Sequence, residues 1–185
     1  MKTHLVAAIA ALLLIAAVGF AAGAGTPGTA TRERVGVYDS RVVAFSYFWS
    51  DPVGRQRDDL VKRAKAAKDA GHAAALKEID RQLVVLQKQA HLQVFSSAPA
   101  NEAMAALAPQ LPALKQELGI ARLVSKWDAK ALKSIPETDR VDVTDRLVRE
   151  FLTPSEKQRK TIETLKTGKP LPLWQARLMT AFGKG

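Results

Sequence analysis

The most regular pattern of apolar and polar positions lies between Val53 and Phe95. This stretch contains no proline and two glycines, Gly54 at its start and Gly71 in its interior, and it is rich in residues that favour helices. Its second half carries apolar residues three and four positions apart, which places one apolar stripe on one helix face. A helix this long with so narrow an apolar face cannot form the core of a globular domain. The pattern therefore predicts a helical arm, over about residues 53–96, that projects from a small body.

Two positions are open for the tip of the arm. The chain can turn at Gly71 and His72, with one helix before the glycine and a second helix after it. Alternatively, one helix runs on to Phe95 and the chain turns at residues 96–99. The second alternative gives an outward helix of about 60 Å, at 1.5 Å per residue, and a return of less than half that length. A helical hairpin with its tip at Gly71 is therefore favoured.

The segment before the arm predicts a strand followed by an aromatic helix. Val35 and Val37 are spaced with the period of a strand. Ser40 or Asp39 can cap a following helix over residues 41–49, which is crowded with aromatic side chains. Such a concentration of aromatic residues indicates packing in the body or at a subunit interface.

The segment after the arm predicts one interrupted helix and two strands. Apolar spacing indicates a helix over residues 101–118, which Pro109 and Pro112 must kink or break. Strands are expected over residues 120–126 and, more weakly, over residues 129–135.

The last part of the chain is predicted to be helical. Thr144 is expected to be the N-cap of a helix that reaches Leu152. The motif Thr153-Pro154-Ser155-Glu156 is typical of a capping box that starts a helix to about Thr167, and a short amphipathic segment follows over residues 173–182. The predicted fold class is α+β, mostly α, with a small β-containing body and a long helical hairpin arm over residues 34–152, and a C-terminal helical extension over residues 153–185.

The N-terminus has the pattern of a secretory signal peptide. A short polar start is followed by an unbroken apolar run from Leu5 to Phe20 and by the small residues Ala22-Gly23-Ala24. An uncleaved membrane anchor is the alternative, because residues 5–24 are just long enough to span a bilayer. The small residues and the Gly/Thr/Pro-rich spacer over residues 25–33 favour cleavage after residue 24 and a periplasmic location.

The composition of the chain excludes some kinds of chemistry and favours some kinds of binding partner. The chain has no cysteine, which excludes disulfides and thiol-based metal or redox chemistry. The net charge of +10 favours acidic protein segments or an anionic membrane surface as partners, and export makes nucleic acid the least favoured partner. No catalytic constellation, phosphate-binding glycine loop or metal-ligand spacing is evident. We therefore expect no enzyme activity, no cofactor and no metal.

Two motifs resemble the Skp (OmpH-type) family of periplasmic chaperones. The first is Val35-Gly36-Val37-Tyr38-Asp39-Ser40. The second consists of Gly119-Ile120-Ala121-Arg122-Leu123-Val124 and Val141-Asp142-Val143-Thr144-Asp145-Arg146-Leu147-Val148. The resemblance covers about residues 34–152. It implies that three copies assemble through their bodies and that their arms surround unfolded outer-membrane proteins without using ATP.

Under this resemblance the arm would bind clients through charge and apolar contact. Basic residues would attract the client, and the apolar stripe would retain it; these residues are Arg55, Arg57, Lys62, Arg63, Lys65 and Lys68, and Leu76, Ile79, Leu83 and Leu86. The basic residues also fit a solvated helix face with internal ion pairs, such as Asp58 with Lys62 and Asp59 with Arg63.

A small body without disulfides buries little surface alone, which favours an oligomer. The predicted subunit interface comprises Val35, Val37, Phe45, Phe48, Trp49, Leu147 and Phe151. The alternative function is a structural or adaptor protein of the cell envelope. Residues 173–182 would then rest on a membrane surface or dock on the protein itself.

Overall fold

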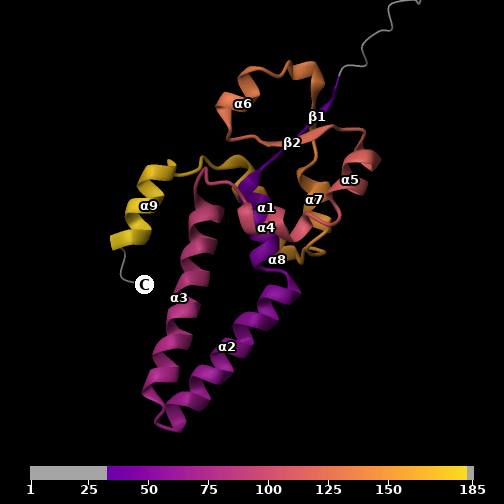
Figure 1. The fold of residues 1–185 in the computed structure, drawn as a ribbon. Coiled ribbons are helices and arrows are strands. Elements are labelled where there is room, and N and C mark those ends of the chain that lie inside the picture. Colours follow the sequence, from indigo (N-terminus) through magenta and orange to yellow (C-terminus); the bar gives the residue numbers. More distant parts are fainter. Residues whose placement is uncertain (1–32, 183–185) are drawn as a thin grey trace, which may run out of the picture. The chain divides into compact units, whose positions relative to one another are not determined.

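The structure, a computed structural model, describes residues 33–182 of the chain. The predicted signal peptide and residues 25–32 of the predicted spacer lie outside the described residues. The described part is mostly helical with one small sheet (Figure 1), which confirms the predicted mostly helical α+β class. Its elements in chain order are β1 (Val35–Tyr38), α1 (Ser40–Phe48), α2 (Asp51–Asp69), α3 (Ala73–Phe95), α4 (Asn101–Leu107), α5 (Leu111–Leu118), β2 (Arg122–Ser125), α6 (Ala129–Lys133), the 3-10 helix η1 (Glu137–Asp139), β3 (Arg140–Asp142), α7 (Thr144–Arg149), α8 (Glu156–Thr167) and α9 (Leu173–Phe182).

The sheet has three parallel strands in the order β2-β1-β3. Val37 in the central strand pairs with Val124 on one side and Asp142 on the other. A Cβ atom at Gly36 would lie 2.5 Å from Ile120 Cδ1 and 2.8 Å from Leu123 Cδ2. Glycine therefore lets these side chains close over the central strand.

The prediction of a strand over residues 129–135 is wrong. Residues 129–133 form α6 instead, because this segment consists of good helix formers and Asp128 caps it by accepting a 2.9 Å hydrogen bond from Ala131 N. The third strand is Arg140–Asp142, at the start of the segment that was expected to lead into the next helix. Arg140 also donates hydrogen bonds to the carbonyl oxygens of Leu132 and Ile135, and thereby ties α6 to β3.

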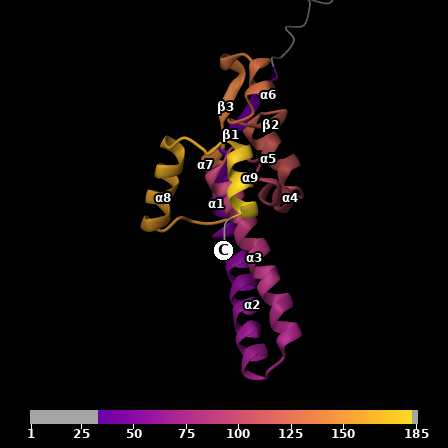
Figure 2. The same cartoon turned by 90° about the vertical axis from the view of Figure 1, so that its left-hand side faces the viewer.

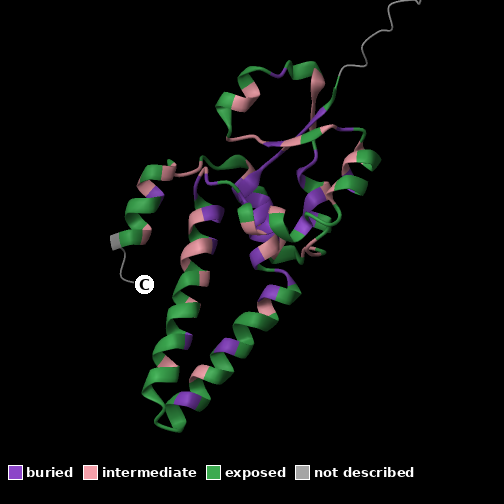
Figure 3. Cartoon of the chain, in the orientation of Figure 1, coloured by how far each residue is buried: buried purple, intermediate pink, exposed green. Residues whose placement is uncertain are grey.

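Helix α1 forms the centre of the main core. Its residues Val42, Val43 and Ala44 have no exposed surface, and the helix contacts α2, α3, α4, α7 and α8. Figure 3 shows the buried residues concentrated on α1 and the segments around it. Its start is capped by Asp39, whose carboxylate accepts a 3.0 Å hydrogen bond from Arg41 N.

Helices α2 and α3 contact each other and turn at Gly71, which confirms the favoured position of the tip. Gly71 has φ 70°, and the next residue, His72, donates a 2.8 Å hydrogen bond from its N to Ala67 O. A glycine adopts this left-handed backbone without steric cost. The described residues form no arm beyond this α2–α3 pair (Figures 1 and 2).

One predicted interruption is confirmed, and one helix boundary differs from the prediction. The helix expected over residues 101–118 is broken into α4 and α5, as its two prolines predicted, because Pro112 occupies the first turn of a new helix. Helix α7 ends at Arg149 rather than Leu152, and Thr144 is not its cap. The Thr144 hydroxyl instead accepts a 3.0 Å hydrogen bond from Asp39 N, so it links α7 to the end of β1.

The C-terminal extension packs against the rest of the described chain. The capping box of α8 is formed by Ser155 and Gln158, two residues later than predicted, and Ile162 and Leu165 belong to the main core. After α8 the chain returns to the end of α3, where Leu171 forms a parallel bridge with Ser96. Helix α9 then contacts α3 (Figures 1 and 2). No described helix is both long enough and apolar enough to cross a bilayer.

Candidate functional site

The predicted basic residues of α2 are exposed, and three of them are paired with acids on the same helix. Ion pairs join Arg57 to Asp58 at 3.2 Å, Arg63 to Asp59 at 3.4 Å and Lys65 to Asp69 at 2.8 Å. The predicted pair of Asp59 with Arg63 is confirmed, whereas Asp58 contacts Arg57 rather than Lys62. Exposed pairs of this kind contribute little to stability.

The other three basic residues of α2 are Arg55, Lys62 and Lys68. Within the described part of the chain they form no ion pair and are exposed. Their charge is therefore directed to solvent, where it can act on an approaching partner.

The predicted apolar stripe faces α2 rather than solvent. Ile79 is buried with Leu60 and Ala67 of α2, and Leu76 and Leu83 pack against this cluster as partly buried residues. Leu86 packs against the main core. The stripe that was predicted to retain clients thus holds the two helices together, because the small residues of α2 allow a close approach along this face.

An apolar groove remains open where α2 and α3 meet the body. The α2–α3 groove has a volume of about 300 Å³, and its walls include Trp49, Val53, Val61, Leu83 and Ala90. Trp49 is 43% exposed and Val61 is 53% exposed, and the Trp49 ring stacks on Phe45 at 4.7 Å between ring centres. Arg57 and His91 also line it. The groove can accept an apolar segment next to a basic side chain.

Most of the predicted interface residues lie inside one chain. Val35, Phe45, Phe48 and Leu147 are buried in the described part of a single copy, and Val37 and Phe151 are partly buried. These residues have little surface left for a second copy, because α1 is covered on several sides by other helices. Of the seven, Trp49 is the residue with a large exposed surface.

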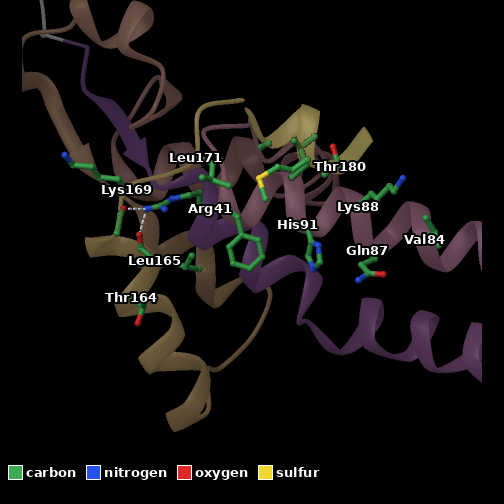
Figure 4. Close-up of a pocket in the computed structure, with 15 residues that line it drawn as sticks. Arg41, Val84, Gln87, Lys88, His91, Thr164, Leu165, Lys169, Leu171 and Thr180 are labelled. Atoms are coloured by element: carbon green, nitrogen blue, oxygen red, sulfur yellow. Dashed lines mark hydrogen bonds between the residues drawn. The ribbon is translucent and has the colours of Figure 1, made fainter. Parts of the chain in front are cut away.

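A second groove lies between α3 and α9. The α3–α9 groove has a volume of about 660 Å³, and Arg41, Lys88, His91, Phe95, Lys169 and Met179 contribute to its walls. Figure 4 shows Arg41 and Lys169 toward one end and Val84 and Lys88 toward the other. Phe95 is 49% exposed and Met179 is 57% exposed. The sequence did not predict this groove, since it depends on the return of the chain to the end of α3.

A partly buried polar cluster adjoins this groove at the carboxyl edge of the sheet. Asp39 directly follows β1, and Lys126 and Trp127 follow β2. Asp39 Oδ1 accepts a 3.0 Å hydrogen bond from Trp127 Nε1, and Lys126 Nζ lies 2.6 Å from Asp39 Oδ2. Arg41 lies over the Trp127 ring at 4.7 Å. In many parallel sheets ligands bind at this edge, but here the protein's own side chains fill it.

Part of this cluster can be recognised from the sequence. A polar or aromatic residue directly follows each of the segments that became β1 and β2. Only the parallel pairing of these strands, which the sequence pattern did not establish, brings their ends to one edge.

Two further ion-pair centres join helices of the body. Arg146 Nε and Nη2 each donate a 2.8 Å hydrogen bond to the Glu117 carboxylate, so they link α7 to α5 and hold the pKa of Glu117 below its usual range. Lys166 Nζ lies 2.9 Å from Asp145 Oδ1, and this hydrogen bond raises the pKa of Lys166. These contacts fix α5, α7 and α8 around the core and offer no reactive group.

The described residues contain no cluster of His, Cys, Asp or Glu that could hold a metal ion. The chain matches no protein-family model, no curated protein and no solved structure. The likeness to the Skp chaperones is therefore carried by the quoted sequence motifs alone.

Proposed function

We propose that the protein is an ATP-independent holdase that binds unfolded polypeptides in the cell envelope. The observation that carries the proposal is the α2–α3 groove, in which Trp49 and Val61 present exposed apolar surface beside Arg57. Unfolded chains expose apolar segments of the kind that such a groove accepts.

In this proposal the two helices act as the arm, and attraction and retention come from different residues. Arg55, Lys62 and Lys68 raise the rate of encounter with acidic or partly acidic chains. The α2–α3 groove, whose walls include Leu83 and Leu86 of the predicted stripe, retains the client through apolar contact. The sequence lacks a nucleotide-binding motif, which supports binding without ATP.

The proposal places the mature chain in the periplasm after cleavage near residue 24. Its clients are unfolded outer-membrane proteins, and its assembly is the trimer that the resemblance implies. Trp49 supplies exposed apolar surface for contacts between copies or with a client. Light scattering of the purified chain gives the mass of the assembly and tests the trimer directly.

The test of function is suppression of aggregation. An unfolded outer-membrane protein is diluted from urea, without nucleotide, into an equivalent amount of the chaperone, and light scattering is recorded. We expect wild type to suppress aggregation and Val61→Glu to lose most of this effect, because a carboxylate in the groove must be desolvated when an apolar segment binds.

Val85→Glu is the matched control. Val85 is 48% exposed, close to the value for Val61, but it lines a different surface, with Gln56, Glu78 and Arg81. This variant should act like wild type. If wild type does not suppress aggregation, the holdase proposal is wrong; if Val61→Glu is as active as wild type, the α2–α3 groove is not the client site.

The adaptor function is favoured by a separate observation. On α9 the side chains of Trp174, Leu178 and Met179 are 70%, 52% and 57% exposed. Large apolar side chains on a solvent-facing helix mark an interaction surface. An adaptor should capture one folded partner or a membrane surface, whereas a holdase should bind diverse proteins only while they are unfolded.

A further inference from the structure

The walls of the α3–α9 groove combine apolar side chains with positive charge. Phe95, Leu171, Ala176 and Met179 provide apolar surface. The described residues that line the groove include the basic side chains of Arg41, Lys88, His91 and Lys169, and none of these lining residues is an acid. The groove is therefore complementary to a molecule with a long apolar part and a negative charge.

Arg41 marks the charged end of the groove. The residue is only 3% exposed and lines the groove, and its Nη2 donates hydrogen bonds to the carbonyl oxygens of Leu165 and Gly168 at the end of α8. Its Nε is buried and donates no hydrogen bond to a described residue. The guanidinium is thus held in place by Nη2, and it contributes a positive charge to this end of the groove.

The charges near Arg41 do not cancel. Asp39 is the one buried carboxylate of this cluster, with Arg41 Nε 3.6 Å from Oδ1 and Lys126 Nζ 2.6 Å from Oδ2. Two cations share one anion, and Lys169 adds an exposed positive charge to the same end of the groove (Figure 4). An additional carboxylate would therefore be attracted to this end.

We propose that the α3–α9 groove binds a long-chain fatty acid. The carboxylate lies at the end formed by Arg41 and Lys169, and the acyl chain lies along Phe95 and Met179 toward Val84. The volume of about 660 Å³ falls within the roughly 300–1,000 Å³ range of small-molecule sites. This site adjoins the α2–α3 groove, with which it shares Gln87 and His91, but it does not depend on the holdase proposal.

The experiment measures binding of palmitate to the purified full chain by displacement of a fluorescent fatty acid, with hexadecanol as the uncharged probe. Palmitate should bind saturably, and about tenfold or more tightly than hexadecanol, since a hydrogen bond to a charged group supports only the acid. Lys169→Gln should weaken binding of palmitate and leave binding of hexadecanol unchanged.

Two neighbouring valines provide the matched pair of variants. Val84 is 41% exposed and lines the groove, whereas Val85 is 48% exposed and points to another surface of α3. Val84→Glu should weaken binding of palmitate by about tenfold or more, because a carboxylate then stands in the path of the acyl chain, and Val85→Glu should bind like wild type. Circular dichroism verifies that both variants are folded.

Three outcomes would overturn the proposal. The first is an absence of saturable binding of palmitate by wild type. The second is equal affinity for palmitate and hexadecanol, which would show an apolar cleft without recognition of a carboxylate. The third is an equal effect of Val84→Glu and Val85→Glu, which would place binding elsewhere. Failure of the aggregation assay would leave this test unaffected, because the two experiments use different ligands and change different groove valines, Val61 and Val84.

Discussion

The Trp127 indole donates a 3.0 Å hydrogen bond from Nε1 to Oδ1 of Asp39, although 88 positions separate the two residues in the chain. This contact joins the ends of β1 and β2. Asp39 is 1% exposed, and its carboxylate also lies close to Arg41 and Lys126. The single acid therefore combines three tasks, because it caps α1, orients Trp127 and balances two cations.

The variant Asp39→Asn tests the contribution of the negative charge of Asp39 separately from its hydrogen bonds. Asparagine is also a good N-cap and can accept the hydrogen bond from Trp127. The variant should nevertheless lower the free energy of unfolding by about 3 kcal/mol, because removal of one partner leaves buried Arg41 without a counter-charge. Urea unfolding followed by tryptophan fluorescence measures the change. Asp58→Asn is the control and should change the free energy of unfolding by less than about 1 kcal/mol, since its ion pair with Arg57 is exposed. Equal losses in both variants would contradict this role of Asp39.

The two glycines of the α2–α3 pair should respond to alanine with opposite signs. Gly54 lies inside α2, Gly71 has φ 70°, and a Cβ atom at either position meets no atom within 4 Å. Gly54→Ala should stabilise the protein by about 0.5–1 kcal/mol, because alanine favours the helix. Gly71→Ala should destabilise it by about 1–2 kcal/mol, because the backbone is left-handed there. Chemical denaturation measures both changes in the free energy of unfolding. A stabilising effect of Gly71→Ala would show that the backbone at residue 71 is not left-handed.

The elements that were predictable depend on local signals. Gly71 is the one glycine in the interior of a long helical stretch, whereas Gly54 lies at its start, so the position of the turn followed from the sequence. The spacing of Val35 and Val37 likewise identified β1. The prediction of a strand failed at residues 129–133, where the sequence pattern was weak. There the N-cap Asp128 stabilises a short helix instead.

The candidate sites were harder to predict because they depend on which surfaces meet. Periodicity identified the stripe at Leu76, Ile79 and Leu83, but periodicity does not show whether solvent or another helix covers a stripe. The α3–α9 groove requires Leu171 to return to Ser96, which is 75 positions away and is not signalled by any local pattern.

The core around α1 is complete within one chain, so folding should not require assembly. Phe45, Phe48 and Leu147 are buried without a second copy. Because assembly of folded copies adds only to a fold that is already complete, the temperature of unfolding should rise only slightly over about a hundredfold range of protein concentration, whereas an obligate oligomer shows a marked rise. Differential scanning calorimetry provides the measurement. A marked rise with concentration would show that contacts between copies supply part of the stability.

The exposed face of α9 should bind anionic membranes. Trp174 and Leu178 present large apolar surface, and Arg177 next to them is an exposed base. The purified chain should sediment with vesicles that contain anionic lipid and less with neutral vesicles. Trp174→Ser should weaken this binding about tenfold, because a large aromatic side chain no longer enters the interface. Val85→Ser is the control for loss of exposed apolar surface elsewhere, and equal weakening by both variants would argue against α9 as the contact.

Charge on α2 should control the rate of client capture more than its lifetime. Arg55, Lys62 and Lys68 form no ion pair within the described chain, so a triple change to Glu breaks no such contact. Capture of an unfolded outer-membrane protein should become several-fold slower at low salt and less dependent on salt, while the dissociation rate changes little. Stopped-flow fluorescence at low and moderate salt separates the two rates.

The control for this prediction is the same change of net charge at a distant place. Lys130 and Lys133 on α6 and Lys157 on α8 are exposed bases that do not line the α2–α3 groove. If attraction depends on the position of the charges, Glu at these three positions should slow capture much less than the α2 variant does. Equal slowing by both variants would mean that net charge alone steers the client, and an unchanged rate in the α2 variant would mean that α2 has no part in capture.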